Sequence, residues 1–340
     1  MRLSLTIVAC LAPLPAWAGA GVAYGWGFNP LIVAPLAGLA WLFMQGAEQM
    51  AARGRPVATW RQSVFYAGLA VLWAALQSPL AAWAGIAYEG HAWQGLLLRI
   101  LGPLLVLLAA PQSALIAGLG RRARRGLARR LPHRGRARRI LRAALQPLPA
   151  ALAFIGTLYL WELPPLQNAA QAQALLGALM RGTFLLTGLW FFATLFHPQD
   201  PPHGPAHVRR QLMLIAATFS QLLLGAAITM KPMVLYTAYH LGLGDEAGGG
   251  YVIWTPSCFV LLAAIILVVH QWNAAEERLW RRAQRGGLSN AEMMALMPQT
   301  AQELWLVVTP KNRRTAYGLS MIPLILFVMV FATVTTVRMM

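Results

Sequence analysis

Acidic residues and cysteines are both scarce in this chain of 340 residues. The 10 Asp and Glu stand against 28 Lys and Arg, and charged residues of both signs make up 11% of the sequence, below the roughly 25% of a soluble domain. Hydrophobic residues make up 58%, against about 45–50% in soluble proteins, and the mean hydropathy is +0.54. This composition excludes an ordinary soluble domain and indicates an all-α integral membrane protein.

The two cysteines, Cys10 and Cys258, lie far apart in apolar surroundings, so a disulfide framework and a metal site of cysteine pairs are both excluded. A bound metal would need His, Met or carboxylate ligands. The sequence also has no nucleophile elbow, phosphate-binding loop, metalloprotease helix or haem-attachment motif. We therefore expect that the protein is not an enzyme.

The first residues combine Arg2, a short apolar core and the small-residue sequence Ala-Trp-Ala before Gly19. This layout predicts a cleavable signal peptide over residues 1–18, with an uncleaved anchor as the alternative. Windows of about 20 apolar residues, the length that crosses a bilayer, then predict a polytopic transmembrane helix bundle. The eight predicted spans are 30–47, 62–82, 92–118, 144–161, 173–196, 211–230, 251–271 and 318–337.

The predicted spans divide the mature chain into three parts. Residues 25–275 form a seven-helix membrane domain, and residues 318–340 add one C-terminal transmembrane helix. Residues 276–317 lie between them as a polar segment. Ser289 followed by Glu292 is a capping-box pattern, so we expect part of this segment to form a helix on the cytoplasmic membrane surface.

Basic residues are concentrated in alternate loops. The predicted loops after the first, third, fifth and seventh spans contain most of them, whereas the opposite loops contain only Lys231. The positive-inside rule therefore places the basic loops in the cytoplasm and residues 19–29 outside. Both ends of the mature chain are then predicted on the outer side of a bacterial inner (plasma) membrane.

The most basic loop, residues 121–142, supplies much of the net charge of +18. An arginine near a membrane surface gains about 1 kcal/mol from anionic lipid headgroups, so we expect these headgroups as partners and no nucleic acid. Another loop contains His197, His203 and His207. Its prolines oppose a regular scaffold that would bring the imidazoles together, and we interpret it as a hydrated linker.

Three charged residues interrupt apolar runs: Arg99, Glu162 and Arg181. A charge in hydrocarbon costs about 2.5–3.5 kcal/mol even on lenient scales, so such residues normally face a bundle interior, a partner or a functional cavity. All three fall in the outer half of neighbouring predicted spans. We predict an intramembrane charge cluster in which Glu162 pairs with at least one arginine. Separate snorkelling of each side chain to the outer headgroups is the alternative.

The predicted outer face also offers candidate metal ligands. His91 lies at the outer end of the third span, and His240 follows Met230 and Met233 after the sixth. Imidazole and thioether ligands suit copper, especially Cu(I). The alternatives are that His91 is an interfacial polar group and that the methionines only pack.

Six segments of the chain follow one another in a characteristic order: GWGFNPLIVAPLAGLAWLF, SPLAAW, GHAWQGLLLRILGPLLVLLAAP, WELPP, GTFLLTGLWFF and GDEAGGGYVIWTP. Over residues 25–275 their order and spacing resemble the Bacillus-type CtaG family of membrane proteins that assist cytochrome c oxidase assembly. The resemblance implies a role in oxidase biogenesis, with an oxidase subunit or another assembly factor as the partner.

The resemblance also implies five histidine positions that could handle copper. His91 matches the first of them, whereas Gly95, Glu162, Gly177 and Arg181 stand at the other four. Arginine has no lone pair for a metal and repels cations. The other family-motif positions are Trp161, Pro164, Asp245, Glu246, Gly249, Gly250 and Trp254.

Two functions therefore stay open. The protein is either an assembly factor that assists copper delivery through a reduced site of His91 with Met or His240, or a metal-free scaffold in which the Glu/Arg cluster has replaced the copper site. A small-solute transporter that uses the charged centre is a third alternative, although no pair of broken helices marks a midplane binding site.

Overall fold

The computed structural model describes residues 29–130, 146–197 and 204–285, together with Thr300, Gln302, Val328 and Met329. All regular elements in this part of the chain are helices, as the composition predicts. The predicted signal peptide, the eighth span and the polar segment beyond Arg285 lie outside it, apart from those four residues.

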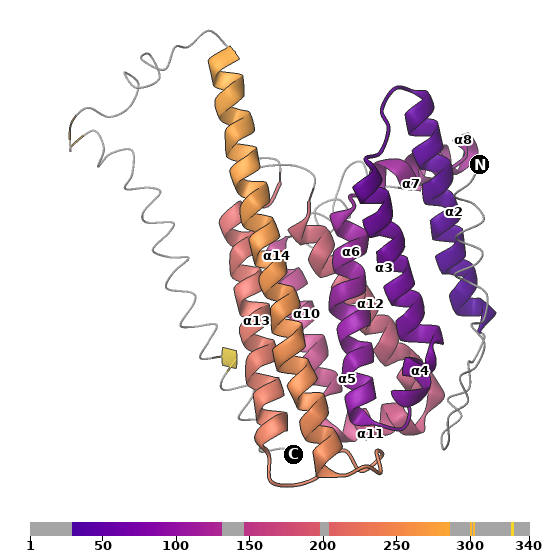
Figure 1. Cartoon of the computed structure of the whole chain (residues 1–340), viewed down its shortest axis with the longest axis vertical. Helices are drawn as coiled ribbons and strands as arrows, with labels where there is room; N and C mark the ends of the chain where they lie inside the picture. Colours follow the sequence, from indigo (N-terminus) through magenta and orange to yellow (C-terminus); the bar gives the residue numbers. More distant parts are fainter. Residues whose placement is uncertain are drawn as a thin grey trace.

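The described helices form a bundle in which most long elements run between the same two ends (Figure 1). They are α2 (Pro30–Ala52), α3 (Thr59–Gln77), α4 (Pro79–Trp83), α5 (Tyr88–Leu96), the π-helical turn η1 (Leu97–Leu101), α6 (Gly102–Leu108), α7 (Gln112–Gly118), α8 (Arg121–Arg130), α10 (Pro147–Trp161), α11 (Pro164–Ala172), α12 (Ala174–Leu195), α13 (His207–Met230) and α14 (Leu243–Arg285).

Within the residues that the structure describes, five helical stretches are long and apolar enough to cross a membrane: α2, the continuous stretch Tyr88–Leu108, α12, α13 and Leu243–Ala275 of α14. Helix α10 is apolar but has only 15 residues, and the ends of α3 carry polar residues. The structure therefore supports a polytopic α-helical membrane protein, whereas the predicted count of seven spans is not confirmed.

In two of the predicted spans, the straight helix ends before the apolar run does. The run 62–82 breaks at Ser78, whose hydroxyl accepts from the backbone N–H of Leu80 at 3.1 Å and starts α4, with Pro79 at its first position. The run 92–118 breaks after α6, where Ala110 has a φ of +49° and redirects the chain into α7. A run of apolar residues thus overestimates the length of a straight helix.

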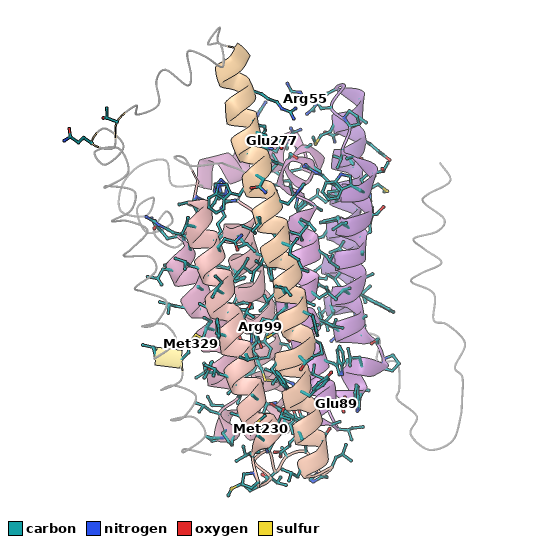
Figure 2. The ribbon with its side chains drawn as sticks, turned by 60° about the vertical axis from the view of Figure 1, so that its left-hand side comes forward. Arg55, Glu89, Arg99, Met230, Glu277 and Met329 are labelled. Atoms are coloured by element: carbon teal, nitrogen blue, oxygen red, sulfur yellow. The ribbon has the colours of Figure 1, made fainter. Side chains whose placement is uncertain are left out.

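The segments rich in basic residues lie at one end of the bundle, and the segments predicted to face outward lie at the other end. In Figure 2, Arg55 and Glu277 mark one end, Glu89 and Met230 mark the other, and Arg99 lies between them. The turn that joins α2 to α3 shares the first end with α8, whereas α4 and α11 lie at the second (Figure 1). This arrangement agrees with the alternation of basic loops; which end faces the cytoplasm stays a prediction.

Glycines allow the helices to approach closely at three crossings. A Cβ atom added at Gly46 would overlap the Ala114 carbonyl of α7, and one at Gly188 would overlap the Arg99 carbonyl of η1. Gly225 lets α13 approach the backbone of α14 in the same way. Small residues are the usual means of close helix packing in membranes, because lipid and protein interiors are equally apolar.

Candidate functional site

A small cavity of about 20 Å³ lies in the interior, between four of the candidate membrane-crossing stretches and the end of α10. This volume is close to that of one water position. Its polar lining comes from residues far apart in the sequence: His91, Arg99, Glu162, Gln221 and Ser257. The structure therefore brings together three of the residues predicted as site residues, His91, Arg99 and Glu162.

Arg99 lies on η1 and is 3% exposed. With its amide oriented to satisfy both neighbours, Gln221 of α13 accepts from the Arg99 guanidinium and donates to the Ile253 carbonyl of α14 at 3.2 Å. The guanidinium carbon also lies 4.2 Å from the ring centre of Phe154. Amide and aromatic contacts both favour the charged form of an arginine, so this buried charge is partly compensated.

The backbone around Arg99 departs from a regular α-helix. A π-helical turn leaves backbone groups out of the usual pairing and occurs frequently at functional sites. On the facing helix, the lack of a side chain at Gly188 lets α12 approach the Arg99 carbonyl. The sequence gives a signal for this crossing in Gly188 but none for the π-helical turn.

Glu162 follows α10 directly and is 2% exposed. The Tyr88 hydroxyl donates to its Oε2 atom at 2.6 Å, and the Tyr236 hydroxyl donates to the same oxygen and to the backbone carbonyl, each at 3.0 Å. Burial and the negative charge of Glu162 raise the pKa of Tyr236 well above its usual value. Tyr236 therefore stays protonated and acts as a donor to the carboxylate.

The predicted ion pair is replaced by separate contacts. The ion pairs between described residues join Lys231 to Glu246 and Arg281 to Glu277, and neither includes a member of the predicted cluster. Arg99 and Glu162 instead lie on the wall of the same cavity, where their charges act on each other.

Arg181 does not line that cavity. It lies near Tyr239 of the loop after α13, where its positive charge opposes the rise in the pKa of the Tyr239 hydroxyl that burial causes. The Tyr239 hydroxyl in turn accepts from Gln167 of α11 at 2.9 Å. The cluster predicted from three charges is thus divided between the cavity and a neighbouring polar contact.

The candidate copper ligands are divided between interior and surface. His91 is 3% exposed, whereas Met230 and Met233 are 76% and 58% exposed and His240 is also exposed. In the described part of the chain, no group of three or more His, Cys, Asp or Glu side chains could hold a metal ion. A copper site of His91 with Met or His240 stays a prediction.

The motif around Asp245 and Glu246 connects α14 to two other parts of the protein. The Asp245 carboxylate accepts from the backbone N–H groups of Tyr88 and Glu89 at 2.7 and 3.1 Å, and so caps the start of α5. Glu246 accepts from the Tyr236 N–H at 2.8 Å, and it also accepts from the N–H of Leu235. These two carboxylates therefore position both tyrosines that bind Glu162.

Lys231 completes this arrangement, and the site prediction missed it. Its ammonium group pairs with Glu246 and donates to the Met233 carbonyl at 3.1 Å, with only 4% of the side chain exposed. A signal was present, since Lys231 is the one basic residue in the predicted outer loops. Tyr88, Tyr236 and Gln221 gave no comparable signal, because uncharged polar residues are common at helix ends and within membrane helices.

The remaining family-motif positions have structural contacts. Trp161 donates from Nε1 to the Thr183 hydroxyl at 2.9 Å and so joins α10 to α12. Pro164 is the first residue of α11. Gly249 packs against Tyr88 and Gly250 against Thr229, so neither position has space for a side chain. Trp254 packs beside Gly225, where α13 and α14 approach each other.

The helical bundle and its buried polar centre define the class of this protein. It is an integral membrane protein in which buried polar side chains connect the helices around a small cavity. The family model of the cytochrome c oxidase caa3 assembly factor (Caa3_CtaG) matches residues 41–275. The chain belongs to this family, as its resemblance to the CtaG type predicts. No curated protein and no solved structure shows a significant match to the chain.

Proposed function

We propose that the protein assists cytochrome c oxidase assembly as a metal-independent membrane scaffold. The family supplies the link to oxidase assembly and points to a role other than catalysis. The observation that carries the metal-independent part is the Arg99 guanidinium, bound to Gln221 on the wall of the cavity that His91 also lines. A fixed positive charge in this position repels a cation.

The polar centre supports a scaffold because it joins helices that are distant in the sequence. Arg99 and Gln221 connect η1 to α13, and Glu162 connects α10 to Tyr88 of α5 and to Tyr236 of the loop after α13. Polar contacts of this kind have few alternatives in hydrocarbon, so they favour one helix arrangement. In the proposed function, this arrangement presents the end near Met230 to an oxidase subunit or another assembly factor.

Copper delivery is the second candidate function, and the burial of His91 in the same cavity favours it. The discriminating measurement is the metal content of purified protein after loading with Cu(I). The proposal predicts no stoichiometric copper in the wild type. Stoichiometric copper that is lost in His91→Ala would support copper delivery instead. A tight site that survives His91→Ala would place the ligands elsewhere, and Met230→Leu with Met233→Leu would then test the exposed methionines.

Oxidase assembly itself is tested in cells that lack the gene and carry a variant copy. The level of assembled oxidase, measured by its haem spectrum, should be restored by the wild type and by His91→Ala, and should fall with Glu162→Ala. Glu162→Gln is the matched variant, because it keeps an acceptor for the Tyr88 and Tyr236 hydroxyls. Failure of the wild type to restore the oxidase would contradict the assembly role.

The exposed arginines at the basic end support a contact with lipid. We propose that the loop 121–142 lies against anionic headgroups, with Arg122 and Arg125 of α8 exposed for this contact. A small-solute transporter gains no support from the cavity, whose volume of about 20 Å³ is too small for a solute larger than water.

A further inference from the structure

A second, larger pocket lies at the end of the bundle that Arg55 marks in Figure 2. Its volume is about 250 Å³, more than ten times the 20 Å³ of the cavity at Arg99. It lies between the end of α2, the start of α3 and the junction of α6 and α7. The lining residues that matter here are Met50, Val57, Trp60, Arg61, Ala110 and Ser113.

The lining of this pocket is cationic on one side and apolar on another. The guanidinium carbon of Arg61 lies 5.3 Å from the ring centre of Trp60, and both side chains are exposed. Ser113 adds a hydroxyl group, while Met50 and Val57 add apolar surface. A tryptophan beside an arginine is typical of the level where lipid headgroups meet the acyl chains.

The electrostatic surroundings favour an anion. Arg53 and Arg55 lie in the exposed turn that leads to the pocket, and no carboxylate is part of its lining. The nearest acidic residue along the chain, Glu48 of α2, does not line the pocket. Within the described residues Arg61 has no ion pair, so its charge is available to a ligand.

The backbone at the pocket is strained. Ala110 has a φ of +49°, a conformation that residues with a side chain rarely adopt. This conformation turns the chain from α6 into α7, where Ser113 lines the same pocket as Trp60 and Arg61 of α3. Strain of this kind persists where the surrounding structure requires it, and it is found preferentially at ligand sites.

We propose that this pocket binds the headgroup phosphate of an anionic phospholipid. Arg61 pairs with the phosphate, Ser113 donates to it, and Trp60 contacts the glycerol region and the first acyl carbons. Basic pockets between transmembrane helices bind anionic headgroups in this manner. The apolar lining distinguishes a lipid from free phosphate, which would leave Met50, Val57 and Trp60 without a partner. The site is separate from the loop 121–142 and independent of the proposed oxidase role.

The test is native mass spectrometry of the full chain in detergent, titrated with phosphatidylglycerol, with phosphatidylcholine of the same acyl chains, and with inorganic phosphate. Phosphatidylglycerol should bind most tightly. Arg61→Gln should weaken its binding about fivefold, which corresponds to about 1 kcal/mol for one interfacial arginine. Ser113→Phe, which fills the pocket, should weaken it further. Arg55→Gln removes the same charge nearby but outside the lining, and should have less than a twofold effect.

Three results would overturn the proposal. An equal loss of phosphatidylglycerol binding in Arg61→Gln and Arg55→Gln would show general attraction of the lipid to a basic surface. Equal binding of phosphatidylcholine would show that the pocket does not select a lipid with net negative charge. Inorganic phosphate that competes fully with phosphatidylglycerol would show a site for the free anion. A thermal melt in detergent identifies any variant that is unfolded, and Ala110→Gly, which relieves the strain and removes only one methyl group from the lining, should retain binding.

Discussion

Arg99 lies with its guanidinium carbon 4.2 Å from the ring centre of Phe154, so that a buried positive charge rests on an aromatic face. A contact of this kind is worth about 0.5–2 kcal/mol, less than the cost of placing a charge in hydrocarbon. The arginine therefore depends on several partners at once, among them Gln221 and the close approach of Gly188. Small changes at this crossing should have large effects.

Gly188→Ala tests that crossing. A Cβ atom at this position would overlap the Arg99 carbonyl, so α12 and η1 would have to separate, at a cost of about 1–3 kcal/mol in the free energy of unfolding. Gly182→Ala on the same helix is the control, because nothing lies within 4 Å of its added Cβ atom. The readout is thermal stability in detergent. Gly182→Ala should be neutral or stabilising, and equal losses in both variants would contradict the predicted clash.

Substitutions of Glu162 test whether its charge is coupled to those of the intramembrane arginines. Glu162→Ala leaves the Tyr88 and Tyr236 hydroxyls without their acceptor and should cost about 1–3 kcal/mol of stability. In a double-mutant cycle with Arg99→Ala we expect non-additive losses, of about 0.5–3 kcal/mol, because both side chains line one cavity. The same cycle with Arg181→Ala should be additive within about 0.5 kcal/mol.

The outcome of these two cycles separates the alternatives. Additive losses with both arginines would favour separate snorkelling of each charge. Coupling to Arg181 alone would show that Glu162 pairs across the bundle in a way that its tyrosine contacts do not indicate.

The interior position of the polar centre could be predicted from the sequence, because Arg99 and Glu162 are charges in apolar runs and such charges avoid lipid. Its partners could not be predicted. Gln221 meets Arg99 in a packing where Gly225 lets α13 approach α14 and Gly188 lets α12 approach η1, and this packing is a property of several helices together. Charge identifies a buried site, whereas its contacts depend on the tertiary arrangement.

The helix boundaries also differ in how far the local sequence predicts them. The break at Ser78 has a local signal in the Ser-Pro sequence, whose hydroxyl and ring both favour a helix start. The turn at Ala110 has only part of its signal in the sequence: Pro111 follows it and favours a helix end, whereas the positive φ of an alanine is imposed by the surrounding contacts. Apolar length therefore predicted that residues 92–118 are helical but missed the turn.

The orientation of the bundle is tested by labelling single cysteines in a background of Cys10→Ser and Cys258→Ser. Arg125→Cys on α8 and Thr237→Cys in the loop after α13 are both at exposed positions at opposite ends. The positive-inside rule predicts that a membrane-impermeant thiol reagent added to whole cells labels Thr237→Cys and not Arg125→Cys. Labelling of Arg125→Cys from outside would reverse the orientation.

Lys231 and Glu246 form the buried ion pair that positions the loop carrying Tyr236. Lys231→Met removes one partner and leaves an uncompensated buried carboxylate, which should cost about 3–5 kcal/mol of stability. Replacing both residues, with Lys231→Met and Glu246→Gln, should be far milder, because the amide oxygen still accepts from the Tyr236 N–H and no charge remains unpaired.

The exposed pair Arg281–Glu277, at 3.2 Å, is the control for this prediction. Arg281→Ala should change stability by less than about 1 kcal/mol, because exposed ion pairs are solvated and screened. The measurement is again thermal stability in detergent, for both single variants and the double variant. A double variant as unstable as the sum of its two single variants would mean that Lys231 and Glu246 stabilise the loop independently. Tyr236 would then be positioned by its own contacts with Glu162 and not by the ion pair.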